Sequence, residues 1–83
     1  MTHNLKTWPG YFQATWVGDK TFEIRKNDRT FKERDEIVLE EWEPGNMEYT
    51  GRAIEGFIRY MTDYEQKQGY VVFQIEITER REG

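Results

Sequence analysis

The sequence contains no cysteine and no serine among its 83 residues. Without cysteine there is no disulfide, no thiolate metal site and no cysteine nucleophile. The lack of serine excludes a serine nucleophile and leaves threonine as the remaining candidate of this kind. Because zinc sites use cysteine and histidine, the single histidine, His3, gives little basis for a metal site. We therefore expect no metal and no cofactor.

Long apolar runs and phosphate-binding loops are missing as well. No stretch approaches the roughly 18–20 apolar residues of a membrane span, and no signal-peptide core follows the polar first residues. Neither a Walker motif nor a GxGxxG motif occurs, which excludes the familiar classes of nucleotide-hydrolysing enzymes. We expect one domain over residues 1–83, located in the cytoplasm and not in a membrane.

Charge is distributed unevenly along a chain whose net charge is −4. Residues 20–34 carry six basic and three acidic side chains, whereas residues 35–65 carry nine acidic side chains against two arginines. The net charge argues against a general nucleic-acid coat. The basic segment is either ordinary surface charge or a local site for an anion.

One short helix is predicted over residues 9–17. A proline begins this segment, and Gly18 suits the left-handed conformation that follows many helices. Trp8, Phe12 and Trp16 are four residues apart and predict a single apolar face. We therefore expect Trp8 and Trp16 to pack in the core.

Most of the remaining chain shows the two-residue period of strands. The expected strands cover residues 3–6, 20–26, 36–42, 48–60 and 70–78. Ile54, Ile58 and Tyr60 are expected on one face of a long strand in which Gly51 and Gly56 indicate bulges. A connection anchored by Phe31, a polar loop over 62–69 and a frayed tail over 79–83 complete the chain. The pattern predicts a mainly β (α+β) fold, a small twisted sheet or partly closed barrel with the helix at one end.

A row of polar side chains follows alternate positions from residue 21. Thr21, Glu23, Arg25 and Asn27 are expected on one side of the strand and Phe22 and Ile24 on the other. An arginine in such a row can bind phosphate or a base edge with two hydrogen bonds. The alternative is a solvated face with a weak Glu–Arg pair. Thr21 next to Lys20 is either a nucleophile with its base or an ordinary strand residue.

Several phrases of the sequence together resemble a known family. Gly18-Asp19-Lys20-Thr21-Phe22-Glu23-Ile24-Arg25 is similar to the signature of ASCH domains, in the PUA-like superfamily. His3-Asn4-Leu5-Lys6 and Pro9-Gly10-Tyr11-Phe12 resemble the opening phrases of a small phage and bacterial branch of unknown function. The resemblance extends over nearly the whole chain and implies a five- to six-stranded PUA-like β-barrel with one or two short helices.

The resemblance also implies a cleft beside the signature that binds RNA or a nucleotide. The residues expected to bind the ligand are Lys20, Thr21, Glu23, Arg25, Lys26, Asn27, Arg29 and Trp42. Tyr11 is a further candidate for base stacking. One ASCH branch hydrolyses acetylated cytidine with a threonine three residues after the lysine, where this chain has Glu23. Arg34 is the second departure, since the family usually has glycine before the aspartate at position 35.

Two other functions remain open. A small hydrolase acting on a modified nucleoside would use Lys20 and Glu23 for acid–base catalysis, with water in place of the threonine. This requires both side chains in one cleft, so Lys20 must precede the regular strand. An adaptor for a host protein would use an acidic strip instead, formed by Glu36, Glu40, Glu41, Glu43 and Glu48.

Overall fold

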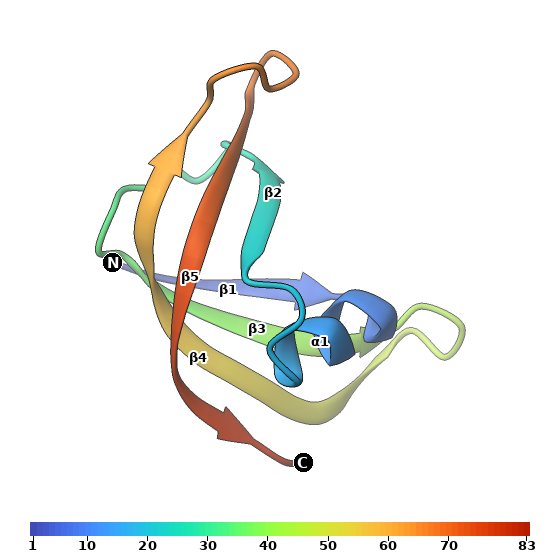
Figure 1. The fold of residues 1–83 in the computed structure, drawn as a ribbon. Coiled ribbons are helices and arrows are strands. Elements are labelled where there is room, and N and C mark those ends of the chain that lie inside the picture. Colours follow the sequence, from blue (N-terminus) through green and yellow to red (C-terminus); the bar gives the residue numbers. More distant parts are fainter.

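The computed structural model describes every residue from Met1 to Gly83 and contains one five-stranded sheet and one helix (Figure 1). Along the chain the elements are β1 (Thr2–Thr7), α1 (Pro9–Trp16), β2 (Phe22–Lys26), β3 (Glu36–Glu43), β4 (Glu48–Thr62) and β5 (Tyr70–Arg81). The predicted mainly β fold with five strands and a helix near the N-terminus is confirmed. No helix of the chain has the length and apolar character needed to cross a membrane.

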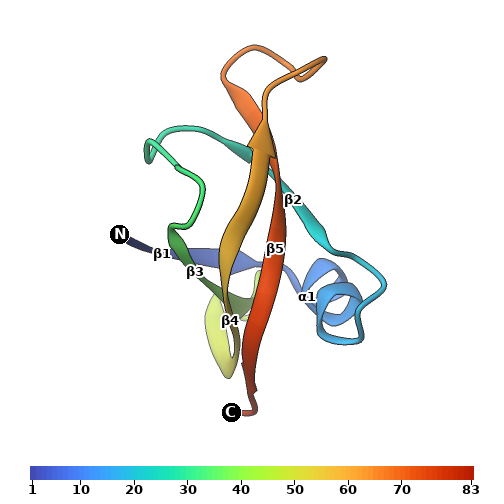
Figure 2. The ribbon, with the colours of Figure 1, turned by 60° about the vertical axis from the view of Figure 1, so that its left-hand side comes forward.

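The sheet is mixed and has the strand order β1-β3-β4-β5-β2. Only β1 and β3 run parallel, and every other pairing is antiparallel. The sheet curls into a half-barrel, so β1 crosses behind β2 and β5 in one view, and α1 lies beside the ends of β1 and β3 (Figures 1 and 2). The two edge strands, β1 and β2, therefore belong to the same side of the molecule.

Three irregularities interrupt the pairing of the long strand β4. One lies against β3, where residues 50–52 of β4, which include Gly51, face only Glu41. The pairing with β5 shifts between Glu55 and Gly56 and again between Ile58 and Tyr60. At Gly56 an added Cβ would lie 2.2 Å from the carbonyl oxygen of Glu76, so only glycine allows this approach. The predicted bulge at Gly56 is confirmed. The expectation that Tyr60 shares the buried face of Ile58 is wrong, because the second shift turns Tyr60 to the solvent.

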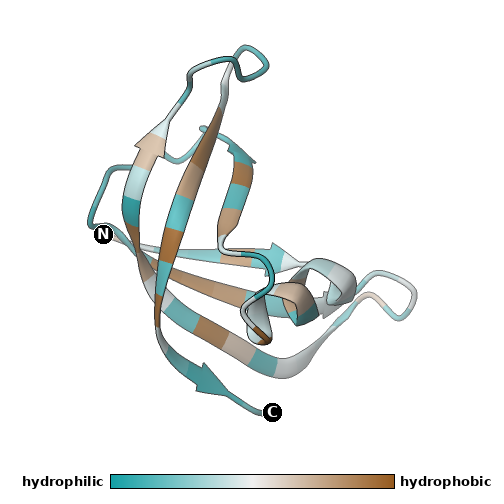
Figure 3. Ribbon diagram, in the orientation of Figure 1, coloured by the Kyte–Doolittle hydropathy of each residue, from teal (hydrophilic) through white to brown (hydrophobic).

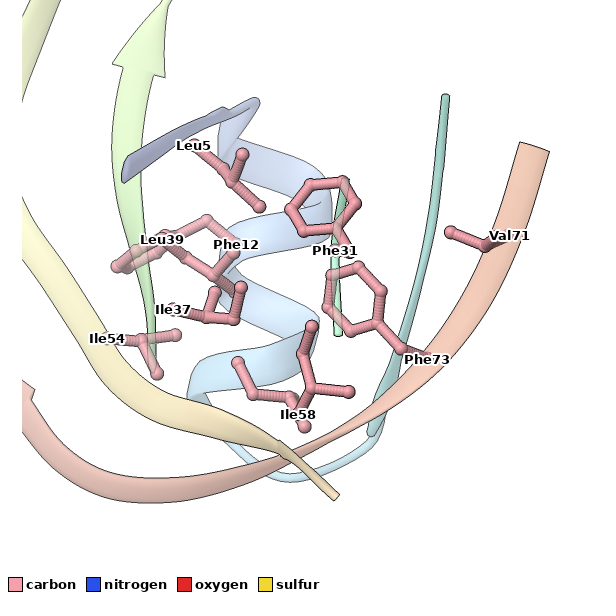
Figure 4. Close-up of a cluster of buried hydrophobic side chains, with 10 residues drawn as sticks. Leu5, Phe12, Phe31, Ile37, Leu39, Ile54, Ile58, Val71 and Phe73 are labelled. Atoms are coloured by element: carbon pink, nitrogen blue, oxygen red, sulfur yellow. The ribbon is translucent and has the colours of Figure 1, made fainter. Parts of the chain in front are cut away.

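The core lies between the curled sheet and α1. Figure 4 shows Phe12 of α1 beside Leu39 and Ile37 of β3, with the ring of Phe31 next to that of Phe73. The buried cluster consists of Leu5, Phe12, Phe31, Ile37, Leu39, Ile54, Ile58, Val71, Phe73 and Ile75. Its members follow the predicted period in β3 and β5, and the alternation along β5 is visible in Figure 3. Phe31 anchors its connection as expected.

The helix is shorter than predicted at one end and places its first tryptophan differently. Its last residue is Trp16, and Gly18 adopts the expected left-handed conformation with φ +90°. Trp8 is the residue before the helix, with an extended backbone at φ −67° and ψ 150°. It therefore leaves the apolar helix face and is 56% exposed, so the core position predicted for Trp8 is wrong. Trp16 packs partly buried against the core.

The expected frayed tail is also wrong over most of its length. Strand β5 continues to Arg81, which pairs with Ala53 of β4. The Arg80 guanidinium donates a hydrogen bond of 2.7 Å to the carbonyl oxygen of Trp16, and Arg81 forms an ion pair with Glu55. Since β4 is long enough to supply a partner, the charged sequence after Thr78 remains regular strand.

Candidate functional site

Two arginines bridge the edges of the half-barrel. We call the line where β1 faces β2 the seam, because side chains and not a backbone ladder connect the two strands. Arg25 of β2 donates to the carbonyl oxygen of Lys6 at 3.2 Å, and Arg29, just after β2, donates to that of Asn4 at 3.0 Å. Arg25 also donates to the hydroxyl of Thr7. The arginines thus satisfy edge carbonyls of β1 that have no strand partner.

A buried carboxylate organises the middle of the seam. The Glu23 side chain accepts hydrogen bonds from Lys20 Nζ at 2.5 Å and from Arg25 Nε at 2.9 Å, and it is almost fully buried. Lys20 Nζ also donates to the carbonyl oxygen of Phe22. The two cations offset the free-energy cost of burying the carboxylate. Without them, the buried charge would be strongly unfavourable.

Lys20 and Glu23 meet because Lys20 precedes the regular strand. Strand β2 begins at Phe22, so the two-residue alternation does not apply to Lys20. Within β2 the predicted alternation is confirmed, yet the polar side is the buried one. Phe22 and Ile24 are 45% and 54% exposed, whereas Glu23 is 3% exposed. The edge of the sheet therefore presents apolar side chains to solvent and holds its carboxylate inside.

An aromatic cleft of about 720 Å³ adjoins this carboxylate. Its apolar wall consists of Trp8, Tyr11, Phe22 and Ile24. Its polar wall consists of Lys6, Thr7, Asp19, Lys20, Glu23 and Arg25. Lys20 Nζ lies 5.8 Å from the centre of the Tyr11 ring and 5.2 Å from that of Phe22. This volume falls in the range of small-molecule and cofactor sites.

A second cleft, of about 440 Å³, continues along the same seam. We call it the basic cleft, because Lys6, Arg25, Lys26 and Arg29 line it with Asp28 as the single acid. Its other lining residues are Asn4, Leu5, Phe31 and Tyr49. Lys6 and Arg25 belong to both clefts, so the two are neighbours.

Along the seam, the cations that have no carboxylate partner all line the basic cleft. Lys20 and Arg25 share the carboxylate of Glu23. Lys6 and Lys26 form no ion pair, and the side chain of Arg29 donates only to a neutral backbone carbonyl. Lys6 Nζ instead lies 4.5 Å from the centre of the Trp42 ring. An anion approaching the seam therefore meets three cations without a carboxylate partner.

Five of the eight predicted ligand-binding residues line the two clefts. They are Lys20, Glu23, Arg25, Lys26 and Arg29. The other three lie outside: Thr21 is exposed before β2, and Trp42 lies under the Lys6 ammonium. The side chain of Asn27 accepts a hydrogen bond from the Phe31 backbone N–H, as a turn residue does.

Sequence reasoning missed the contribution of β1. Lys6 and Thr7 reach the site only because β1 ends beside β2. They lie 19 and 18 positions before Arg25, which contacts both of them. Tyr49, which lines the basic cleft, comes from the start of β4. No local pattern encodes these contacts. The only signal was the His3–Lys6 phrase of the family resemblance, which contains Lys6.

Two further ionisable networks lie outside the clefts. The hydrogen bond from His3 lowers the pKa of the Asp35 carboxyl, and the hydrogen bond from Arg52 lowers the pKa of Glu41. Glu41 is buried and paired with Arg52, so it cannot contribute to the exposed acidic strip expected for a host partner. No group of three or more His, Cys, Asp or Glu side chains is placed to hold a metal ion.

Comparison with known proteins identifies a family and a relative. The sequence profile of DUF3850, described as a domain of unknown function, matches residues 2–75. The chain is 38% identical over 61 residues to the "Uncharacterized 12.9 kDa protein in GpA 3'region" of Escherichia phage P2. The match covers 74% of this chain and 54% of the phage protein, so the chain spans about half the length of that relative.

Proposed function

We propose that this protein, which belongs to the DUF3850 family, binds RNA or a nucleotide along the seam between β1 and β2. The observation that carries the proposal is an aromatic cleft that adjoins unneutralised cations on a protein whose net charge is −4. A ligand with a flat apolar face and a negative charge matches both parts. Nucleotides combine these features in one molecule.

The aromatic cleft supplies surfaces for a base. Trp8 and Tyr11 are exposed, although large aromatic side chains of a small protein usually add to its core. A base stacked on such a ring contributes about 1–3 kcal/mol. Glu23 is already occupied by Lys20 and Arg25, so we assign it the task of holding these two cations in place.

The resemblance to ASCH domains supports the same function. We propose that the half-barrel belongs with the PUA-like superfamily, for which RNA or nucleotide binding is the inferred role. The seam residues Lys20, Glu23 and Arg25 come from the phrase that carries this resemblance. The cysteine-free sequence suits a reducing compartment, and we place the protein in the cytoplasm on that basis.

Fluorescence anisotropy of a labelled 12-nucleotide single-stranded RNA tests the proposal. Trp8→Leu should weaken binding about 5- to 150-fold, which corresponds to the loss of one stacked base. Tyr64→Leu is the matched control, because Tyr64 is an exposed aromatic residue in the polar β4–β5 loop. Undetectable binding of the wild-type protein at low salt, or equal affinities of the Trp8 and Tyr64 variants, would refute the proposal.

Hydrolysis of a modified nucleoside is the second candidate, because Lys20 and Glu23 do share one cleft. Thr7 is the only hydroxyl nucleophile there apart from Tyr11, and its proton is donated to the carbonyl oxygen of Leu5, not to a base. The test is release of acetate from acetylated cytidine, followed by proton NMR. Turnover that Glu23→Gln abolishes would favour the hydrolase over a binding module.

A host-protein adaptor remains the third candidate and has less support. Its acidic strip loses Glu41, whose carboxylate accepts hydrogen bonds from Arg52 and Thr50. Affinity capture from host lysate, with and without nuclease, separates a protein partner from one that RNA recruits.

A further inference from the structure

We propose that the ligand is a single-stranded oligonucleotide that occupies both clefts, with a base in the aromatic cleft and the adjoining phosphates over the basic cleft. This inference rests on the proposed function and extends it from a nucleotide in general to a chain of nucleotides. It follows from how apolar surface and free charge are divided along the seam.

The two clefts form one path. They are adjacent along the seam and share Lys6 and Arg25 as lining residues, so one extended ligand can contact both. Phe22 lines the aromatic cleft and Lys26 lines the basic cleft, at the two ends of β2. The two residues are four positions apart along the strand, a distance of about 13 Å. A single base stacked near Phe22 therefore leaves the far end of the path empty.

Each cleft supplies what the other lacks. Most of the surface exposed in the aromatic cleft is apolar, and two of its three cations are engaged by Glu23. In the basic cleft, Lys26 and Arg29 are exposed and have no carboxylate partner. A mononucleotide would use the stacking surface but not these two charges. A longer chain places its following phosphates beside them.

A single strand fits this arrangement better than a duplex. The bases of a duplex stack on one another, so the flat faces that Trp8 and Tyr11 would contact are hidden. The combination of an aromatic platform and a basic track along a backbone is the arrangement by which proteins bind single strands with little sequence preference. The expected ligand is therefore a short unpaired segment with an accessible base.

The test compares uridylates of one, two, four and eight nucleotides by calorimetry at low salt. Affinity should rise from the mononucleotide to the tetranucleotide. Lys26→Gln/Arg29→Gln should weaken binding of the tetranucleotide and leave binding of the mononucleotide within about twofold of wild type. Lys67→Gln/Arg59→Gln is the control, since it removes the same charge from residues outside both clefts.

Salt dependence gives a second readout. Each phosphate contact contributes about 0.7 to the slope of log affinity against log salt for a single strand. Loss of two contacts should reduce that slope by about 1.4, so the wild-type affinity should fall about sevenfold further than that of the variant between 50 and 200 mM salt. The Lys67/Arg59 control should retain the wild-type slope.

The outcomes separate this inference from the proposed function. Equal affinity for the mononucleotide and the tetranucleotide, unaffected by Lys26→Gln/Arg29→Gln, would overturn the oligonucleotide inference while leaving nucleotide binding intact. Failure of every length to bind would overturn both. Because Arg29 also contacts the Asn4 carbonyl, Lys26→Gln alone provides a variant that leaves the seam unchanged and should reduce the slope by about 0.7.

Discussion

Replacing Arg25 by alanine should open the seam and lower the free energy of unfolding. The guanidinium is the one group that contacts Glu23, the Lys6 carbonyl and the Thr7 hydroxyl together. Without it, the buried carboxylate of Glu23 keeps only Lys20, and the carbonyl of Lys6 loses its side-chain partner. The perturbation thus acts on a charge pair and on the contact between two edge strands.

The expected loss is about 2–4 kcal/mol. Removing one partner of a buried ion pair costs about 3–5 kcal/mol. Lys20 remains beside Glu23, and the Arg25 side chain is 25% exposed, so water compensates part of this cost. The hydrogen bonds to Lys6 and Thr7 add about 0.5–1.5 kcal/mol each before solvent replaces them. A chain of this length has a total stability of about 4–12 kcal/mol, so the loss is a large fraction of it.

Urea unfolding followed by tryptophan fluorescence measures this change. A loss of 2–4 kcal/mol corresponds to a decrease in melting temperature of about 10–25 °C for a domain of this size. Arg25→Lys keeps the charge but not the planar set of donors, so its loss should be about half that of the alanine variant. A double-mutant cycle with Glu23→Gln isolates the pair. An Arg25→Ala protein within about 0.5 kcal/mol of wild type, as for an ordinary surface substitution, would refute the reasoning.

Two further predictions concern backbone strain and pH. Arg34 has φ +77°, a conformation that costs a non-glycine residue about 1–2 kcal/mol. Arg34→Gly removes this strain but gives the unfolded chain more conformational entropy, so the net stabilisation should be about 0.5–1 kcal/mol. A lower free energy of unfolding in urea would contradict this. The folded-state pKa values of Asp35 and Glu41 lie below the unfolded values of 3.8 and 4.5, because His3 and Arg52 donate hydrogen bonds to the two carboxylates. Their stabilisation is therefore complete above these unfolded values and is lost as the pH falls through the lower folded-state values. Glu41→Gln should lower stability at neutral pH and flatten its decrease below about pH 4.5 in urea titrations, and an unchanged acid slope would contradict this.

Local patterns predicted the elements of the fold better than their ends and faces. The alternation of β3 and β5 correctly located both strands and their buried residues, because each packs one face on the core. The errors arise where a distant partner decides the outcome. Tyr60 was assigned to the wrong face because a shift against β5 precedes it, and the last residues form strand because β4 pairs with them. Neither partner can be identified from the segment itself.

The candidate site shows the same limit. Lys20, Glu23 and Arg25 are close in sequence, and their association in one cleft follows from where β2 begins. The other wall, with Lys6 and Trp8, comes from β1 and the residue before the helix. The departure at Arg34, noted from the sequence, has a structural counterpart in its left-handed backbone, which glycine would adopt without strain.

The strand pairings also determine when the seam can form during folding. Both edges that meet there are held by long-range pairings: Thr2 pairs with Glu36, and Phe22 pairs with Gln74, 52 residues further along the chain. The antiparallel hairpins β3–β4 and β4–β5 close much shorter loops, and short loops form first because they lose less chain entropy. During synthesis β2 lacks its only strand partner until residues 70–74 have left the ribosome. The nascent chain therefore acquires its two clefts last, after most of the sheet is already paired.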